Sequence, residues 1–290
     1  MPIVRILSIS GSLAFLCLCL CLSSCEENPP FAIDFTIYKD TTFVTTPETP
    51  QAKTVLIEEF TGVRCRNCPA GHEKTRQILE ENPNRVVAAI IHAGYFADPY
   101  PQSSQVFATE ETEDIHNLLG VIANPAAAID RQWFTGEDKI PVDNKNAWAS
   151  RVAEQLSKTA PLNLSINREY NENTRNATIA VRLAYTQTQT DEQYITAYLI
   201  ETDIIDAQLM AGENGQQDYI IPDYAHRHIV RDVLTPITGK KVEATRINGT
   251  VVITQLEATL PQGWNAEKCS VVAFVHQANG VVQAAEIPLK

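Results

Sequence analysis

The sequence predicts two domains of different class, an α/β domain over residues 51–160 and an all-β domain over residues 161–290. Two observations lead to this prediction. In the first region, continuous apolar segments alternate with segments of helical spacing, a pattern typical of parallel strands covered by helices. In the second region, apolar and polar residues alternate along short segments between turn residues, which is typical of half-buried antiparallel strands.

The N-terminus has the features of a bacterial lipoprotein precursor. An arginine precedes an apolar run over residues 13–22, which is too short to span a bilayer permanently. The run ends in Leu-Ser-Ser-Cys, which matches the lipobox, so residues 1–24 are expected to be a signal peptide and Cys25 to carry lipid. The alternative is an ordinary signal peptide. Residues 25–50 are rich in Thr, Pro and Glu and indicate a lipidated tether, in which residues 31–38 alternate like a short docked strand.

The first domain is organised around residues 54–72. This stretch opens with an apolar run typical of a buried strand, and a Thr-Gly pair interrupts it. Cys65 and Cys68 follow, and after Pro69 the spacing of apolar residues becomes helical. A Cys-x-x-Cys pair between a strand and the start of a helix is the context of a redox motif.

The two cysteines are expected to play different roles. Free backbone N–H groups at the helix start lower the pKa of the first thiol, so Cys65 is the predicted nucleophile, and Arg64 and Arg66 favour its thiolate. Cys68, one turn along, is placed to resolve a mixed disulfide. We expect Cys65 to be accessible and Cys68 to be buried. The alternatives are a structural disulfide, or half of a zinc site for which the sequence offers no second Cys-x-x-Cys.

The stretch resembles the thioredoxin superfamily beyond its cysteines. Members carry a buried acidic residue six positions before the first cysteine, which is Glu59 here, and a cis-proline loop, which the segment ending in Pro125 resembles. The resemblance implies that Glu59 accepts a proton, with a pKa raised by burial, and that the backbone beside Pro125 pairs with an extended peptide. We therefore expect a cis Asn124–Pro125 bond. The sequence departs from the family in having Arg64 in place of the usual tryptophan, and Arg-Asn rather than Gly-Pro between the cysteines.

The rest of the first domain reads as alternating strands and helices. Residues 85–92 form an apolar run typical of a strand covered on both faces, and residues 93–112 read as an irregular insertion that could form a substrate rim. Helical spacing follows at residues 110–119 and, after two short strands, at residues 144–156. These elements complete the expected thioredoxin-like domain.

The second domain reads as about seven short strands separated by turns. Asn-Gly pairs at residues 248–249 and 279–280 are flanked by alternating runs, the strongest short signal for a hairpin. This pattern predicts a β-sandwich of immunoglobulin-like type, interrupted by a long loop at residues 206–241.

Taken together, these features resemble the outer membrane protein 28 family of Bacteroidetes lipoproteins. The lipobox, the segment EEFTGVRCRNCPAGH, the Asn124-Pro125 loop and the segment HRHIVRDVL carry the resemblance. It implies an outer-membrane lipoprotein at the periplasmic face or the cell surface. The net charge of −12 and the lack of a basic cluster argue against nucleic acid as a partner.

Other candidate residues have simpler interpretations. His226 and His228 share a face if they lie on a strand, and could bind a metal, but hydrogen bonding to backbone is the expected role. His72 is expected at the surface, His92 as a hydrogen-bonded core residue, and Cys269 as a small buried hydrophobe. We predict no cofactor and no metal site.

These observations lead to two hypotheses for function. The first is a thiol–disulfide oxidoreductase, anchored by N-terminal lipid, that acts on thiols or disulfides of extracytoplasmic proteins or peptides through Cys65, Cys68, Glu59 and Pro125. The second is a non-catalytic binding or adhesion lipoprotein that uses the same fold as a scaffold. The reduction potential of the cysteine pair separates them.

Overall fold

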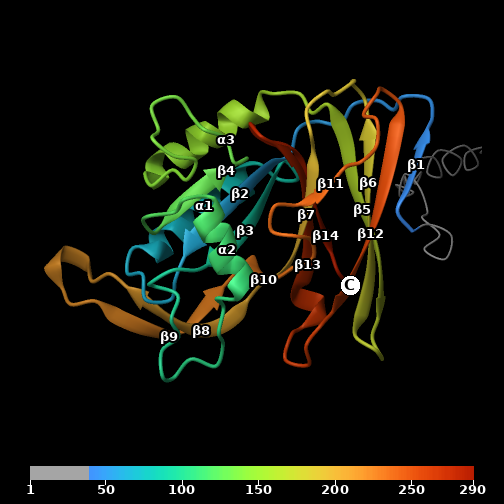
Figure 1. Ribbon diagram of the computed structural model, residues 1–290. Helices are drawn as coiled ribbons and strands as arrows, with labels where there is room; N and C mark the ends of the chain where they lie inside the picture. Colours follow the sequence, from blue (N-terminus) through green and yellow to red (C-terminus); the bar gives the residue numbers. More distant parts are fainter. Residues whose placement is uncertain (1–38) are drawn as a thin grey trace, which may run out of the picture. The chain divides into compact units, whose positions relative to one another are not determined.

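The computed structural model describes residues 39–290, and all of them belong to one compact unit. The expected signal peptide, the lipid-carrying Cys25 and the short strand at residues 31–38 lie outside the described residues. Within the described residues, strands dominate: the chain forms fourteen strands and only three α-helices (Figure 1).

The larger of the two main sheets has eight strands and mixes segments from both ends of the chain. Its members in spatial order are β14 (Gly280–Pro288), β13 (Cys269–Gln277), β7 (Tyr194–Glu201), β10 (Ile229–Val233), β3 (Val86–His92), β2 (Val55–Thr61) and β4 (Ala126–Ile129), with β11 (Lys240–Lys241) beside β7. β2 and β3 are parallel and buried along their whole length, because helices or strands cover both of their faces.

The expected fold class, a thioredoxin-like α/β domain followed by a separate immunoglobulin-like sandwich, is wrong. β10 pairs in parallel with β3 at Ile229 and Ile90, and it pairs antiparallel with β7 on its other side. One sheet therefore runs without interruption from the strands expected in the first domain to those expected in the second. The pairing of β10 with β3 and β7 could not be inferred from the sequence. β10 is short and has a bulge between Val230 and Asp232, which breaks the alternation of apolar residues.

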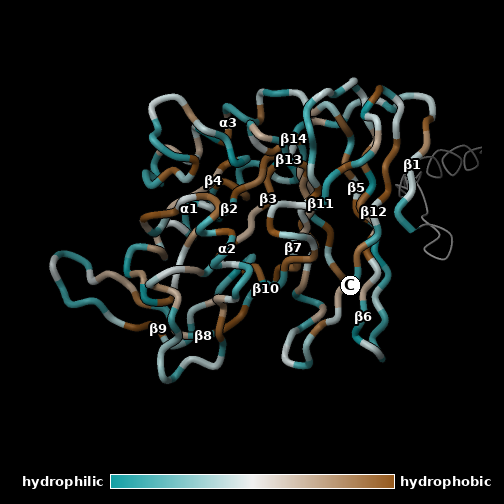
Figure 2. The backbone as a smooth tube through the Cα atoms, in the orientation of Figure 1, coloured by the Kyte–Doolittle hydropathy of each residue, from teal (hydrophilic) through white to brown (hydrophobic). Residues whose placement is uncertain are grey.

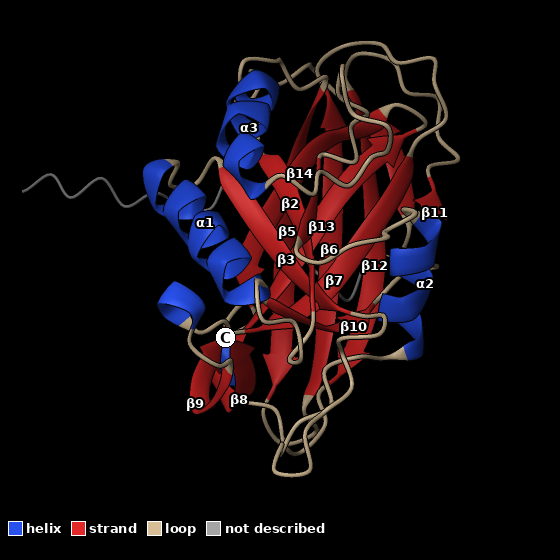
Figure 3. Cartoon of the chain, turned by 90° about the vertical axis from the view of Figure 1, so that its left-hand side faces the viewer, coloured by secondary structure: helices blue, strands red, loops and turns tan. Residues whose placement is uncertain are grey.

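The helices cover the β2–β3–β4 end of this sheet on both faces (Figure 3). α1 (Cys68–Glu81) and α3 (Trp148–Leu156) lie on one face, where Ile78 and Trp148 pack against Ile57. α2 (Glu110–Leu118) lies on the opposite face, where Ile115 packs against Phe60. The expected helices at residues 110–119 and 144–156 are thus present, but the expected second strand between them is only an isolated bridge from Ala127 to Val142.

A four-stranded sheet packs against the other end of the large sheet. Its strands, in spatial order, are β1 (Thr41–Val44), β12 (Thr250–Thr259), β6 (Asn176–Tyr185) and β5 (Leu162–Asn171). Apolar side chains of β5, β6 and β12 meet those of β7, β13 and β14 in a continuous core, which appears as brown segments along the facing strands in Figure 2. β1 lies within the expected tether, whose described part is therefore docked on β12.

Buried polar contacts hold the two ends of the large sheet together. The Arg131 guanidinium, after β4, donates to both carboxylate oxygens of Glu58 on β2 at 2.7 Å and to the Tyr198 hydroxyl on β7 at 2.8 Å. Lys53 pairs with Asp130 at 2.9 Å, and the backbone N–H of Val281 on β14 donates to the Asp130 carbonyl at 2.7 Å. Buried ion pairs of this kind are costly to break because each partner is left uncompensated.

A separate hairpin projects from the connection between β7 and β10. It consists of β8 (Ile204–Met210) and β9 (Tyr219–His226), paired antiparallel (Figure 1). The segment 206–241, expected to be a loop, therefore contains most of this hairpin together with β10 and β11. Of the two Asn-Gly hairpins, the one at residues 279–280 joins β13 to β14 as expected, whereas the strand after residue 249 pairs with β6 and β1 rather than across that turn.

Within the described part of the chain, none of the helices combines the length and the apolar character needed to cross a membrane.

Candidate functional site

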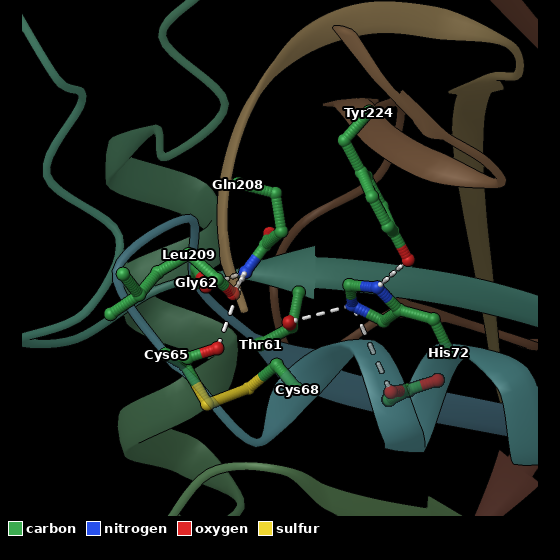
Figure 4. The surroundings of a disulfide bond; sticks show 9 residues. Thr61, Gly62, Cys65, Cys68, His72, Gln208, Leu209 and Tyr224 are labelled. Carbon is green, nitrogen blue, oxygen red and sulfur yellow. Dashed lines mark hydrogen bonds and ion pairs between the residues drawn. A yellow bond between two sulfur atoms is a disulfide. The ribbon is translucent and has the colours of Figure 1, made fainter. Parts of the chain in front are cut away.

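The cysteine pair lies between β2 and α1, as the sequence predicts. β2 ends at Thr61, residues 62–67 form a series of turns that we call the cysteine loop, and α1 begins at Cys68. Cys65 and Cys68 form a disulfide whose Cα atoms are 5.3 Å apart (Figure 4). The backbone N–H of Cys68 donates to the carbonyl of Cys65 at 3.2 Å, so the loop leads directly into the first turn of the helix.

The expectation that Cys65 is accessible is wrong, because the β8–β9 hairpin covers the cysteine loop. Cys65 is 3% exposed and Cys68 is fully buried. The Leu209 N–H donates to the Val63 carbonyl at 2.8 Å, and the side-chain amide of Gln208 donates to the Cys65 carbonyl at 3.2 Å (Figure 4). A segment far along the chain thus occupies the outer edge of the loop, which local sequence could not indicate.

The two arginines beside Cys65 have oxygen partners of their own. Arg64 donates to the carbonyls of Asp98 and Pro99 at 2.8 and 2.6 Å. Arg66 forms an ion pair with Asp218, in the connection between β8 and β9, at 3.0 Å. Arg66 therefore helps hold the hairpin against the cysteine loop, a role that the sequence did not suggest.

Glu59 lies on β2 behind α1 and is fully buried. Its Oε2 accepts a hydrogen bond from the Thr75 hydroxyl of α1 at 2.6 Å, whereas its Oε1 has no hydrogen-bond partner. Burial raises the pKa of Glu59 to about 8, and the bond from Thr75 only partly offsets this. The expected raised pKa is confirmed, so the carboxyl group can exchange a proton near neutral pH.

Pro125 approaches the same turn of α1 as Glu59. The Asn124–Pro125 peptide bond is cis, as expected. A Cβ atom added to Gly71 would lie 2.6 Å from Oε1 of Glu59 and 2.9 Å from Cβ of Pro125, so only glycine fits between them. Gly71 is one turn after Cys68, and the fold therefore brings Glu59 and Pro125 together against the first turns of the helix that carries the disulfide.

His72 is not a surface residue, contrary to expectation. Its side chain is 15% exposed and is bonded on both ring nitrogens: Nε2 lies 2.8 Å from the Thr61 hydroxyl and Nδ1 lies 2.8 Å from the Tyr224 hydroxyl (Figure 4). Nε2 is also 4.0 Å from Oε1 of Glu59. Tyr224 and Thr61 were not identified from the sequence. The segment DYAH at residues 223–226 did hold a signal, because its alternation places Tyr224 and His226 on one face of a strand.

A groove of about 600 Å³ opens beside His72, between α1 and the segment from β9 to β10. Its walls include Leu79 and Arg76 of α1, and Tyr224 and Ile229 of the opposite segment. Glu59 is not part of its lining, but two residues next to the Glu59 carboxyl group, His72 and Thr75, are. We call it the α1–β9 groove.

His92 and His226 pack against each other, with ring centroids 5.5 Å apart, and His226 also lines the α1–β9 groove. Burial holds the pKa of His92 well below its ordinary value, and neither of its ring nitrogens has a hydrogen-bond partner, so the expectation of a bonded core histidine is wrong. His226 is buried against Phe107, with ring centroids 4.7 Å apart. Among residues 39–290, no group of three or more His, Cys, Asp or Glu side chains is arranged to hold a metal ion. Cys269 is buried as expected, and burial raises the pKa of its thiol to about 12.

The sequence and the fold were compared with known proteins. The family model described as outer membrane protein Omp28 matches residues 112–288. Among solved structures, HBP35 of Porphyromonas gingivalis superposes with a TM-score of 0.60 at 20% identity, covering 85% of this chain and 77% of that protein. Protein AGR_C_4864 from Agrobacterium tumefaciens superposes with a TM-score of 0.51 at 14% identity, covering 83% of this chain and 97% of that protein. At these identities the likeness shows the fold alone. No curated protein matches the chain.

Proposed function

We propose that this chain, which belongs to the Omp28 family of outer membrane proteins, carries out thiol–disulfide exchange at the outer membrane. The exchange would use the Cys65–Cys68 pair. Its substrates are thiols or disulfides of extracytoplasmic proteins or peptides. The outer membrane location follows from the family, and the chemistry is inferred from the residues around the disulfide.

The observation that carries this proposal is the buried carboxyl group of Glu59. A disulfide that only stabilises a fold needs no acid behind it, and burying an acid with an unpaired oxygen is unfavourable. An exchange site can use such a group, because a buried sulfur that leaves a disulfide as a thiolate is stabilised when it gains a proton. With its pKa raised to about 8, Glu59 can supply or accept that proton at neutral pH.

The proposed reaction has two steps. A substrate thiolate attacks the sulfur of Cys65, a new S–S bond forms, and the electron pair of the Cys65–Cys68 bond leaves on the sulfur of Cys68, which takes a proton from Glu59. A second substrate thiolate then attacks the substrate sulfur of the mixed disulfide and releases Cys65 as a thiolate. The substrate is oxidised to a disulfide, and the protein gains two electrons, which leave Cys65 as a thiolate and Cys68 as a thiol. In the reverse direction Cys65 is the nucleophile and Cys68 resolves, while the backbone beside Pro125 holds an extended peptide.

Lipid on Cys25 is the proposed membrane anchor. The described part of the tether does not stand free of the domain, because its strand β1 pairs with β12. Cys25→Ala should leave an unlipidated precursor that no longer partitions with outer membranes. Unchanged partitioning of Cys25→Ala with the outer membrane would contradict the anchor.

A non-catalytic binding role is the second candidate, and one observation favours it. Only 3% of Cys65 is exposed, and the β8–β9 hairpin lies over the cysteine loop, an arrangement that also suits a structural disulfide. Under this alternative the pair stays oxidised and the fold presents a binding surface.

The reduction potential of the Cys65–Cys68 pair separates the two candidates. The purified mature protein is equilibrated with defined ratios of reduced and oxidised dithiothreitol, and the fraction of free thiol is read by alkylation and mass. A potential at or above about −270 mV supports exchange, whereas one below about −300 mV marks a structural disulfide. The Cys269→Ala variant serves as the reference protein, because it removes the one other thiol of residues 39–290.

A further inference from the structure

We propose that His72 is a positioning residue that carries protons between Glu59 and the α1–β9 groove during thiol–disulfide exchange. The inference rests on the proposed function, because it concerns the proton that this exchange requires. It assigns to the buried carboxyl group of Glu59 a route to the groove from Oε1, the oxygen that the Thr75 hydroxyl does not occupy.

Glu59 needs such a route because its own surroundings are closed. Its carboxyl group is fully buried, and Thr75 on α1 occupies Oε2. Oε1 faces Gly71, where a Cβ atom would come within 2.6 Å of it, so no water can be accommodated on that side. Nε2 of His72, a residue that lines the α1–β9 groove, lies 4.0 Å from Oε1. This gap is about 1 Å longer than a hydrogen bond, and a rotation of either side chain can close it.

His72 is held in a way that leaves both ring nitrogens available for proton transfer. Nε2 is bonded to the Thr61 hydroxyl and Nδ1 to the Tyr224 hydroxyl, and each hydroxyl can donate or accept. Either neutral tautomer of the ring therefore keeps both hydrogen bonds. Burial, with a smaller contribution from His226, lowers the pKa of His72 to about 3, so the ring is neutral at pH 7 and one nitrogen can accept.

The outer end of the path opens into the groove. His72 and Tyr224 both line the α1–β9 groove, whose volume of about 600 Å³ holds several waters. The charges of Glu73 on α1 and Arg227 after β9 act on Tyr224, and His226 on β9 acts on His72. Arg76, Glu80 and His228 also line the groove. His92 on β3 also lies within electrostatic range of the His72 ring.

The proton balance follows from the exchange reaction. When a thiolate attacks Cys65, the Cys68 sulfur leaves with the electron pair and takes the proton of Glu59. The resulting carboxylate takes a proton at Oε1 from Nε2 of His72, and Nδ1 receives one from the Tyr224 hydroxyl and groove water. The net change is one proton moved from the groove to the Cys68 thiol, with Glu59 and Tyr224 restored and His72 left in its other neutral tautomer, which reverts when the Thr61 and Tyr224 hydroxyls reverse their hydrogen bonds.

The test uses dithiothreitol as reductant, so it does not depend on any physiological substrate. Reduction of the oxidised mature protein is followed by stopped-flow mixing at pH 7 for wild type, His72→Ala and Tyr224→Phe. We expect His72→Ala to be reduced at least tenfold more slowly, with the rate restored as imidazole is added up to about 100 mM, since imidazole can enter the groove and replace the ring. Tyr224→Phe keeps the aromatic packing and should slow the reaction several-fold.

The matched control is His228→Asn, which also lines the groove but touches none of these residues, and whose positive φ of 53° suits asparagine. Its rate should equal that of wild type, with no response to imidazole. A purely structural role for His72 could slow the reaction, but imidazole would not restore it. The inference is overturned if His72→Ala is reduced at the wild-type rate. It is also overturned if His72→Ala is slow, imidazole does not restore its rate, and Tyr224→Phe is reduced at the normal rate. A potential below about −300 mV would instead refute the proposed function.

Discussion

Replacing Glu59 with glutamine should make the stability of the protein less dependent on pH. In the folded protein burial raises the pKa of this carboxyl group from 4.5 to about 8. Below pH 4.5 it is protonated in both the folded and the unfolded state and does not affect stability. Between pH 4.5 and 8 the unfolded chain ionises while the folded protein holds the proton, so the free energy of unfolding falls as the pH rises.

The size of the effect follows from the shift. The pKa of Glu59 rises from 4.5 to about 8, and each pKa unit corresponds to about 1.4 kcal/mol, so ionisation can lower the free energy of unfolding by at most about 5 kcal/mol. The loss approaches this limit at pH 8. Glu59→Gln should therefore be close to wild type at pH 5 and at least about 2 kcal/mol more stable at pH 8. The amide keeps an acceptor for the Thr75 hydroxyl, so packing against α1 is retained.

Urea denaturation of the oxidised protein at pH 5, 6.5 and 8 measures this effect. Glu81→Gln, at the exposed end of the same helix, is the matched control and should show no change in pH dependence. Taking differences between each variant and wild type removes the contributions of the buried histidines, which act mainly below pH 6.5. A Glu59→Gln difference that stays constant within about 0.5 kcal/mol from pH 5 to 8 would refute the reasoning about this carboxyl group.

Three further predictions concern other contacts. Arg131→Met should lower the free energy of unfolding by about 3–5 kcal/mol, because it leaves the buried carboxylate of Glu58 without its partner; a loss below 1 kcal/mol in urea denaturation would argue against this contact. His92→Phe should stabilise the protein more at pH 5 than at pH 8, because the unfolded chain binds a proton at His92 below about pH 6.5 that the folded protein excludes; thermal melts at both pH values check this, and an equal gain at both would contradict it. Gln208→Ala should speed reduction of the disulfide by dithiothreitol by about fivefold, the equivalent of about 1 kcal/mol from lost hydrogen bonds to the cysteine loop; an unchanged rate would mean that the hairpin does not limit access.

The local structure around the cysteines could be predicted from the sequence because neighbouring residues determine it. Three features within about twenty residues predict this structure: the apolar run of β2, the break after it and the helical spacing after Pro69. The structure has the strand and the helix where expected. The cis bond before Pro125 and the burial of Cys269 were likewise anticipated. The cis bond was expected from the resemblance to the thioredoxin superfamily, and the burial of Cys269 from the usual place of a lone cysteine.

The fold class failed because it depends on pairings between distant segments. Ile229 of β10 lies beside Ile90 of β3, and a five-residue strand with a bulge gives no alternation from which that neighbour could be inferred. The same limit explains the error at His72. His72 lies seven residues after Cys65, about two helical turns away, and was expected at the surface, but β9 brings Tyr224 onto it from far along the chain.

The site therefore combines elements from both halves of the chain. β2 and α1 supply the disulfide and Glu59, whereas the β8–β9 hairpin supplies the cover over the cysteine loop and the Tyr224 hydroxyl. Since the hairpin is bonded to the loop through Leu209 and Gln208, access to the sulfur of Cys65 depends on how readily these bonds open.

Trapping of mixed disulfides tests the central claim most directly. Cys68→Ala leaves Cys65 free to attack a substrate disulfide but removes the residue that resolves the product. Expressed in the native outer membrane, Cys68→Ala should accumulate higher-mass adducts that disappear on reduction. Cys65→Ala and the double variant, made in the Cys269→Ala background, should give none. If Cys68→Ala yields no more reducible adduct than the double variant, the pair does not exchange with substrates and the disulfide is structural.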